Sequence, residues 1–125
     1  MKKIISTGNA PAAIGPYSQA VEAGGLVFIS GQLPIDPATG AMAPAEIKAQ
    51  TEAVIKNIDG ILKAEGLTLA NVLKTTVFMA DLGQFAQMNE VYGKFFSSNP
   101  PARATIEVKA LPKAALVAIE AVAAR

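Results

Sequence analysis

The sequence contains neither cysteine nor histidine among its 125 residues. The absence of cysteine excludes disulfides, a thiol nucleophile and a thiolate metal site. The absence of histidine removes the commonest general base and the commonest metal ligand. Any catalysis must therefore use Arg, Lys, Glu, Asp, Tyr, Ser or Thr side chains, backbone groups or water.

Charged residues are also scarce, since they make up 17% of the chain, whereas about 25% is usual. Hydrophobic residues make up 51%. Because a small domain has much surface to cover, this composition predicts that part of the surface is buried against another subunit. The formal net charge of +1 provides no basic field, so we expect no nucleic-acid partner.

Long apolar runs are missing as well. Residues 114–124 form the longest weakly charged run, but Glu120 interrupts it and it is too short to cross a bilayer. The basic start, Met1-Lys2-Lys3, is followed by only two apolar residues, so we expect no signal peptide. These patterns predict a cytoplasmic protein with no membrane partner.

The spacing of apolar residues predicts one α+β domain over residues 1–125. The expected strands cover residues 2–6, 18–23, 26–30, 72–80, 103–110 and 116–123, and the expected helices cover residues 46–65 and 84–96. Gly24-Gly25 predicts a tight hairpin, because glycine adopts positive φ without strain. Two amphipathic helices can cover only one face of such a sheet, so we expect another subunit to cover the other face.

Arg103 is the most informative single residue, because the chain has nine lysines and only two arginines. It starts a strand directly after Pro100-Pro101, which ends the preceding segment. A guanidinium binds a carboxylate or phosphate through two parallel hydrogen bonds, which lysine cannot do. Two interpretations stay equally open: an anion anchor, or a structural ion pair with Glu107 or Glu120.

Three further residues have both a functional and a structural interpretation. Tyr17 follows Gly15-Pro16, so its ring either forms a wall over a ligand or packs at a subunit interface. Gly31 ends a strand, where it either lets a ligand approach the backbone or begins a loop. Asn89 lies among the aromatic residues of the second helix and needs hydrogen-bond partners, which are either a backbone loop or a ligand.

We expect the last two strands to pair as a hairpin, with register set by their apolar residues. Their polar face would then carry Arg103, Thr105, Ala118 and Glu120. Glu120 is the only charge in a long apolar strand and therefore needs a cation or several donors. Arg103 is the expected partner of this carboxylate.

Six segments of the chain, in this order, resemble motifs of the RidA/YjgF family, the reactive-intermediate deaminases. They are residues 10–19 (APAAIGPYSQ), 30–32 (SGQ), 74–78 (KTTVF), 89–92 (NEVY), 101–103 (PAR) and 110–113 (ALPK). The resemblance covers nearly the whole chain. It implies a chorismate-mutase-like α+β fold, with a six-stranded mixed sheet and two helices on one face. It also implies a homotrimer that assembles through the sheets, with clefts between subunits.

Active members of this family hydrolyse 2-aminoacrylate, 2-iminobutanoate and related imines or enamines to 2-keto acids and ammonia, without a cofactor. An imine carbon is already electrophilic, so the reaction needs a grip on the carboxylate, a closed cleft and an oriented water. By resemblance, Arg103 binds the carboxylate and Gly31 offers backbone contacts. Tyr17, Asn89 and Thr105 line the cleft, with Tyr17 reaching in from a neighbouring subunit.

One position departs from the family pattern. Active members read Ile-Glu-Ile-Glu-Ala in the last strand, and the first glutamate is credited with orienting the water. Here Ala118 occupies that place, and Glu120 matches the second glutamate. Glu120 is the remaining carboxylate that could act from a shifted place. A general acid or base typically contributes ~10²- to 10⁴-fold, so we expect a loss of rate.

The resemblance therefore leaves two main functions open. The first is a deaminase acting on small 2-imino carboxylates, weakened by Ala118. The second is a trimeric, non-catalytic module that binds a small carboxylate and has a regulatory role, which Ala118 favours. A third function sometimes attached to the family, RNA cleavage, is disfavoured by the near-neutral charge and the absence of histidine.

Overall fold

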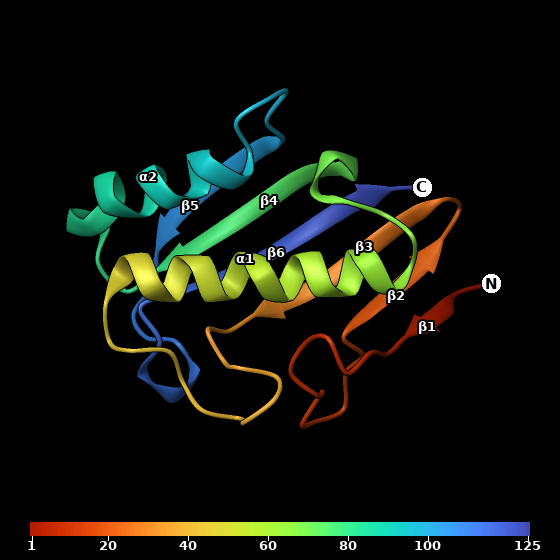
Figure 1. Cartoon of the computed structure of the whole chain (residues 1–125), viewed down its shortest axis with the longest axis horizontal. Helices are drawn as coiled ribbons and strands as arrows, with labels where there is room; N and C mark the ends of the chain where they lie inside the picture. The colour runs from red at the N-terminus through yellow and green to blue at the C-terminus, as the bar shows by residue number, and fades with distance from the viewer.

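The computed structural model describes residues 1–125 and contains all eight expected helices and strands (Figure 1). The elements are β1 (Lys3–Ile5), β2 (Ala20–Ala23), β3 (Leu26–Gln32), α1 (Ile47–Ala64), β4 (Val72–Met79), α2 (Phe85–Phe95), β5 (Ala102–Glu107) and β6 (Val117–Ala124). Gly24 and Gly25 form the turn of the β2–β3 hairpin with φ angles of 58° and 78°. This confirms the hairpin that the glycine pair predicts.

The six strands form one mixed sheet in the order β1-β2-β3-β6-β4-β5. β4 and β5 pair in parallel, whereas every other neighbouring pair is antiparallel. The expected hairpin between the last two strands is therefore wrong, because β4 lies between β5 and β6. The reason is the helical crossover: α2 returns the chain so that β5 runs parallel to β4. β6 then occupies the free edge of β4.

This topology also changes which residues share a face. In the β4–β5 register, Arg103 lies opposite Thr75, on the face that the helices cover. Ala118 and Glu120 lie on the other face of β6, where Ala118 is opposite Phe78. Arg103 and Glu120 are therefore on opposite faces of the sheet, and the expected pairing of these two residues is wrong.

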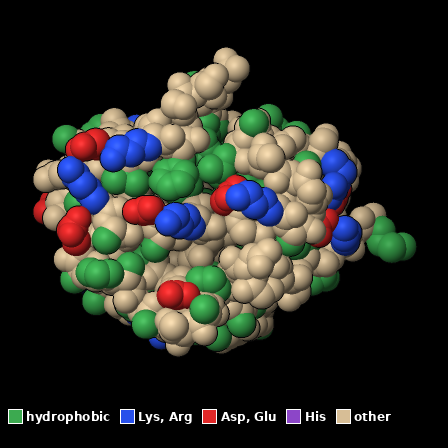
Figure 2. Space-filling view, in the orientation of Figure 1, with side chains coloured by type: hydrophobic (Ala, Val, Ile, Leu, Met, Phe, Trp, Pro, Cys, Tyr) green, Lys and Arg blue, Asp and Glu red, His purple; other side chains and the backbone are tan.

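The core lies between the sheet and the two helices, which cover the same face of it (Figure 1). The apolar stripe of α1 is confirmed, because Ile47, Thr51, Val54, Ile55, Ile58, Ile61 and Leu62 are all buried. The outward side of the helices carries acidic and basic side chains interspersed (Figure 2). Neither helix has the length and apolar character that crossing a membrane requires.

The opposite face of the sheet has no helix over it (Figure 1). Phe28 and Ile106 are each 44% exposed, and both lie on this open face. They are continuous across the strands with Phe78, Ala118 and Val122, as the pairing register shows. An apolar face of this kind marks a contact surface, which agrees with the scarcity of charge in the sequence.

An ion-pair cluster lies at one end of the molecule and links several elements there. The Arg125 guanidinium donates hydrogen bonds of 2.9 Å to both carboxylate oxygens of Glu22 and one of 2.8 Å to Glu65. Lys3 also binds Glu65, with Nζ 2.7 Å from Oε1. The Arg125 hydrogen bonds lower the pKa of the Glu22 carboxyl below its usual value. The cluster therefore ties β1, β2 and the end of α1 to the last residue of the chain.

Gly60 allows the 7–11 segment to lie directly against α1, since a Cβ built there would be 2.3 Å from the Asn9 carbonyl oxygen. We predict that Gly60→Ala lowers the free energy of unfolding by about 1–3 kcal/mol, because overpacking outweighs the gain in helix propensity. Gly93→Ala on α2, where a Cβ meets nothing within 4 Å, is the matched control and should be neutral or stabilising. Urea denaturation measures both; equal behaviour of the two variants would contradict the prediction.

Candidate active site

Arg103 lies at the start of β5, beneath α2. Its Nη1 donates a 2.6 Å hydrogen bond to Oδ1 of Asn89 on α2. Its guanidinium carbon is 4.7 Å from the ring centre of Tyr92 and 5.5 Å from that of Phe85. Cation–π contacts and the amide oxygen hold the charged group in one orientation. The structure thus brings together two of the predicted site residues, Arg103 and Asn89.

No carboxylate of the chain forms an ion pair with Arg103. Glu107, one of the two structural partners considered, instead accepts a 2.9 Å hydrogen bond from the Leu82 backbone. Glu120, the other, is on the far face of the sheet. A partly exposed guanidinium without an acidic partner favours the anion-anchor interpretation over the structural ion pair.

Three hydroxyl groups lie near Arg103, on Tyr92, Thr75 and Thr105. The Tyr92 hydroxyl and the Thr75 hydroxyl are 2.7 Å apart and buried. Burial raises the pKa of the Tyr92 phenol, so this hydroxyl is neutral at neutral pH. Thr105, two residues along β5 on the same face as Arg103, has a hydroxyl shut off from solvent with no hydrogen-bond partner. This buried hydroxyl is an unused donor or acceptor.

Tyr17 and Gly31 lie away from Arg103 in the folded chain. Both line a hollow of about 280 Å³ beside the N-terminal loop, which Lys113 and Asp36 also border. Tyr17 is 52% exposed, and a Cβ at Gly31 would meet nothing within 4 Å. Both residues are therefore open to a ligand or a neighbouring subunit. Gly31 lies inside β3, which continues to Gln32, so the expectation that it ends the strand is wrong by one residue.

Glu120 lies near Tyr17 rather than near Arg103. Both line an open hollow of about 660 Å³, whose other residues include Ser30 and Phe28. The Glu120 carboxylate is exposed and has no ion-pair partner in the chain. Within one chain the predicted residues thus form two groups. Arg103, Asn89 and Thr105 surround β5, whereas Tyr17, Gly31 and Glu120 surround β3 and β6.

The two groups are too far apart to act together in one chain. β3 and β5 are separated by β6 and β4, which amounts to roughly 14 Å at about 4.8 Å per strand. Sequence reasoning also missed the contribution of Phe85, Tyr92 and Thr75 to the Arg103 environment. The signal for the two aromatic residues was present, because Phe85 and Tyr92 lie four before and three after Asn89 on one helix face.

The structure is a small α+β domain that carries, under its second helix, an arginine without a carboxylate partner in the chain. The family described as Endoribonuclease L-PSP matches residues 7–125. The chain therefore belongs to this family, which is the RidA/YjgF family. Its fold is the chorismate-mutase-like one that the sequence motifs imply.

Individual relatives agree with this assignment. The chain is 52% identical to a RutC family protein of Pyrococcus horikoshii, over 98% of each chain. It is 50% identical to a protein of Bos taurus named 2-iminobutanoate/2-iminopropanoate deaminase, over 98% of this chain and 90% of that one. The crystal structure of E. coli TdcF with bound serine superposes with a TM-score of 0.94, at 44% identity and 98% coverage of each chain.

The buried hydroxyl pair offers a test of how the Arg103 environment is held. We predict that Tyr92→Phe lowers the free energy of unfolding by about 1–3 kcal/mol, because it leaves the Thr75 hydroxyl buried and unpaired. Thr75→Val should have a similar effect on the Tyr92 hydroxyl. The double variant should lose less than the sum, since neither hydroxyl then remains without a partner. Strict additivity in urea denaturation would show that the two hydroxyls are not coupled.

Proposed function

We propose that this protein hydrolyses small 2-imino and 2-enamino acids to 2-keto acids and ammonia. The observation that carries the proposal is Arg103, a guanidinium held by Asn89 and Tyr92 but left without a carboxylate of its own. Relatives about 50% identical over nearly the whole chain bear the name of this deaminase activity. The bound serine of a solved relative is an amino acid with the carboxylate that Arg103 would bind.

In the proposed reaction the substrate carboxylate forms two parallel hydrogen bonds with Arg103. The oxygen of a water molecule then bonds to the electrophilic imine carbon, and a water proton moves to the nitrogen. The hydroxyl proton of the resulting carbinolamine then moves to the nitrogen, and ammonia leaves as the C–N bond breaks and the C=O bond forms. The protein supplies position and a fixed positive charge, and no cofactor takes part. Thr105, two residues along β5 on the same face as Arg103, would line the substrate cleft.

We propose further that the site is completed by assembly into a homotrimer through the open sheet face. The exposed Phe28 and Ile106 on that face support this assembly, since another copy would bury them. The separation of Arg103 from Tyr17 and Gly31 within one chain supports a cleft built from two subunits. In such a cleft, Tyr17, Gly31 and Glu120 of a neighbour would face Arg103, Asn89 and Thr105.

A second candidate function rests on Ala118. A methyl group cannot hold a water or transfer a proton, and Ala118 is only 5% exposed beside Phe78. Glu120 lies on the same face two residues along and is the carboxylate left to act as a general base. If it does not, the protein would be a trimeric module that binds small carboxylates without turning them over.

The first test measures release of ammonia and 2-keto acid from freshly generated 2-iminobutanoate. We predict that the protein makes 2-iminobutanoate decay faster than it does in buffer alone. Arg103→Ala should lower kcat/KM about 10- to 100-fold, because this is the usual contribution of a charge-assisted hydrogen-bonded pair. Lys109→Ala, which removes an exposed charge beyond the end of β5, is the control and should be unchanged. Equal losses in both variants would show that Arg103 does not anchor the substrate.

The same assay separates the two candidate functions through Ala118→Glu, which restores the usual carboxylate. An inert wild type that becomes active with Ala118→Glu would establish the binding module as the natural role. An active wild type whose activity falls with Glu120→Gln would instead establish Glu120 as the base of a working deaminase.

Subunit mixing tests whether the cleft is shared. Arg103→Ala removes one half of the proposed site, and Gly31→Leu blocks the other half with a side chain for which the fold has room. After the two impaired variants are unfolded and refolded together, random assembly should restore about a quarter of the wild-type sites. Refolding each variant alone is the control. No recovery in assembled mixtures would place both halves within one subunit.

A further inference from the structure

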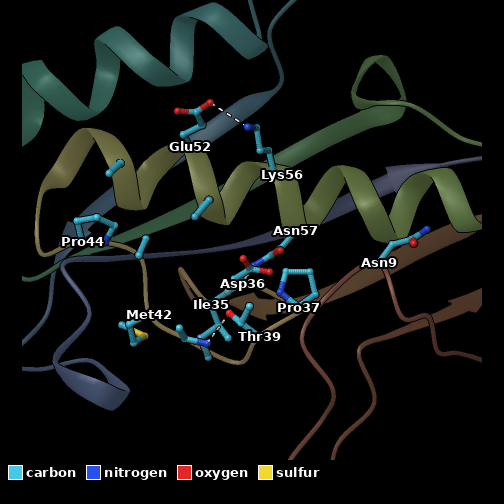
Figure 3. A pocket seen from close by; sticks show the side chains of 14 residues that line it. Asn9, Ile35, Asp36, Pro37, Thr39, Met42, Pro44, Glu52, Lys56 and Asn57 are labelled. Atoms are coloured by element: carbon cyan, nitrogen blue, oxygen red, sulfur yellow. Dashed lines mark hydrogen bonds and ion pairs between the residues drawn. The ribbon is translucent and has the colours of Figure 1, made fainter.

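A separate cavity of about 610 Å³ lies between α1 and the facing loop of residues 35–44 (Figure 3). It shares no residue with the Arg103 environment. Its only residues in common with the Tyr17 and Gly31 hollow are Ile35, Asp36 and Pro37, which form the wall between the two. The cavity is on the helix side of the sheet, away from the open apolar face. It is also within the usual size range of small-molecule sites.

Hydrogen bonds hold the two walls of this cavity together. Asn57 of α1 donates from Nδ2 to the carbonyl oxygens of Leu33 and Ile35, at 3.0 and 2.9 Å. The loop closes on itself through the bridge between Ile35 and Met42. On the helix the lining residues Ala49 and Ala53 are small, so the loop cannot collapse onto large side chains there. The cavity is therefore preformed and partly apolar.

Asn57 gives the cavity an acceptor that no group of the chain uses, whereas Asn9 and Thr39 add neutral polar groups that can donate or accept. Asn57 is only 3% exposed, and while its Nδ2 is fully used, no donor of the chain reaches its Oδ1. That oxygen is not sealed off, because the one unpaired and fully enclosed side-chain polar atom is the Thr105 hydroxyl. Asn57 points from α1 toward Asp36 and Pro37 of the loop (Figure 3). Its free oxygen thus faces the cavity that it lines.

The charged side chains of the cavity carry a net negative charge. Asp36 and Glu52 contribute two carboxylates, and Lys56 contributes one ammonium group. The lysine is already engaged, since its Nζ is 3.0 Å from Glu52 Oε1. Asp36 has one oxygen bound to the Ala38 backbone N–H at 2.8 Å and keeps the other free. A ligand here therefore meets unpaired acceptors and a net negative charge, with no free cation for an acid.

We propose that this cavity is a second ligand site, which binds a small organic ammonium ion. The ammonium group would donate to Asn57 Oδ1 and to the Asp36 carboxylate. Its apolar part would lie on Ala49, Ala53 and Met42. The proposal does not rest on the deaminase activity: only Asp36 also borders the hollow of Tyr17 and Gly31, and none of its residues has an assigned role in the reaction.

The test uses benzylammonium, benzyl alcohol and benzoate as probes of one shape and different charge, and follows backbone amide NMR shifts. Benzylammonium should give saturable shifts at residues 36–43 and 49–57, with a millimolar Kd expected for a ligand of this size. Benzyl alcohol should bind at least about tenfold more weakly, and benzoate more weakly still, because charge-assisted hydrogen bonds are the stronger ones. Equal binding of benzylammonium and benzyl alcohol, or shifts that do not saturate, would overturn the proposal.

Two variants locate the binding. Ala53→Leu fills the cavity and should abolish the shifts, whereas Ala64→Leu, at an exposed position of the same helix, should leave them unchanged. Asp36→Asn keeps the acceptor for the Ala38 N–H and removes the charge. It should weaken benzylammonium about tenfold and leave benzyl alcohol unaffected. Benzylammonium binding that survives both Ala53→Leu and Asp36→Asn would place the ligand elsewhere and refute the assignment.

Discussion

The parallel pairing of β4 with β5 is the constraint on which the candidate site depends. α2 connects these two strands, so it must pack back over them, and the register places Arg103 opposite Thr75. Tyr92 and Asn89 on α2 then contact the guanidinium from above. An antiparallel β5 beside β6 would have placed the arginine beside Glu120 and neutralised it. The crossover thus keeps a positive charge without a protein counter-ion, which is the property that an anion anchor needs.

The covering of a single sheet face explains why the candidate site is divided. Two helices can cover only one side of a six-stranded sheet, and the other side keeps Phe28, Phe78 and Ile106 in an apolar surface. The residues of β3 and β5 that would bind substrate are separated by two intervening strands. An assembly that buries the open face could bring the edge of one sheet to the loops of another. Stability and site formation would then have a common cause, the burial of the same apolar surface.

The loop of residues 35–44 is shared between the two hollows that lie on either side of it. It contributes Ile35, Asp36 and Pro37 to two hollows at once. Asn57 holds the loop in place through two hydrogen bonds from a buried position on α1. Because both nitrogen-bound hydrogens are used, the amide oxygen is left over for the cavity. The same residue therefore stabilises the loop and gives the proposed second site its central acceptor.

The sequence by itself determined the elements, the family and the list of candidate residues. Local patterns were sufficient for these: the stripe of α1, the Gly24-Gly25 turn and motifs such as PAR at residues 101–103 depend on neighbours along the chain. Only the tertiary structure decided which residues meet. Strand alternation assigns residues to two faces but does not say which strands are adjacent, so Glu120 was paired with Arg103 although β4 lies between their strands. The α1 cavity was also beyond the sequence, because its acceptor depends on hydrogen bonds between segments more than twenty residues apart.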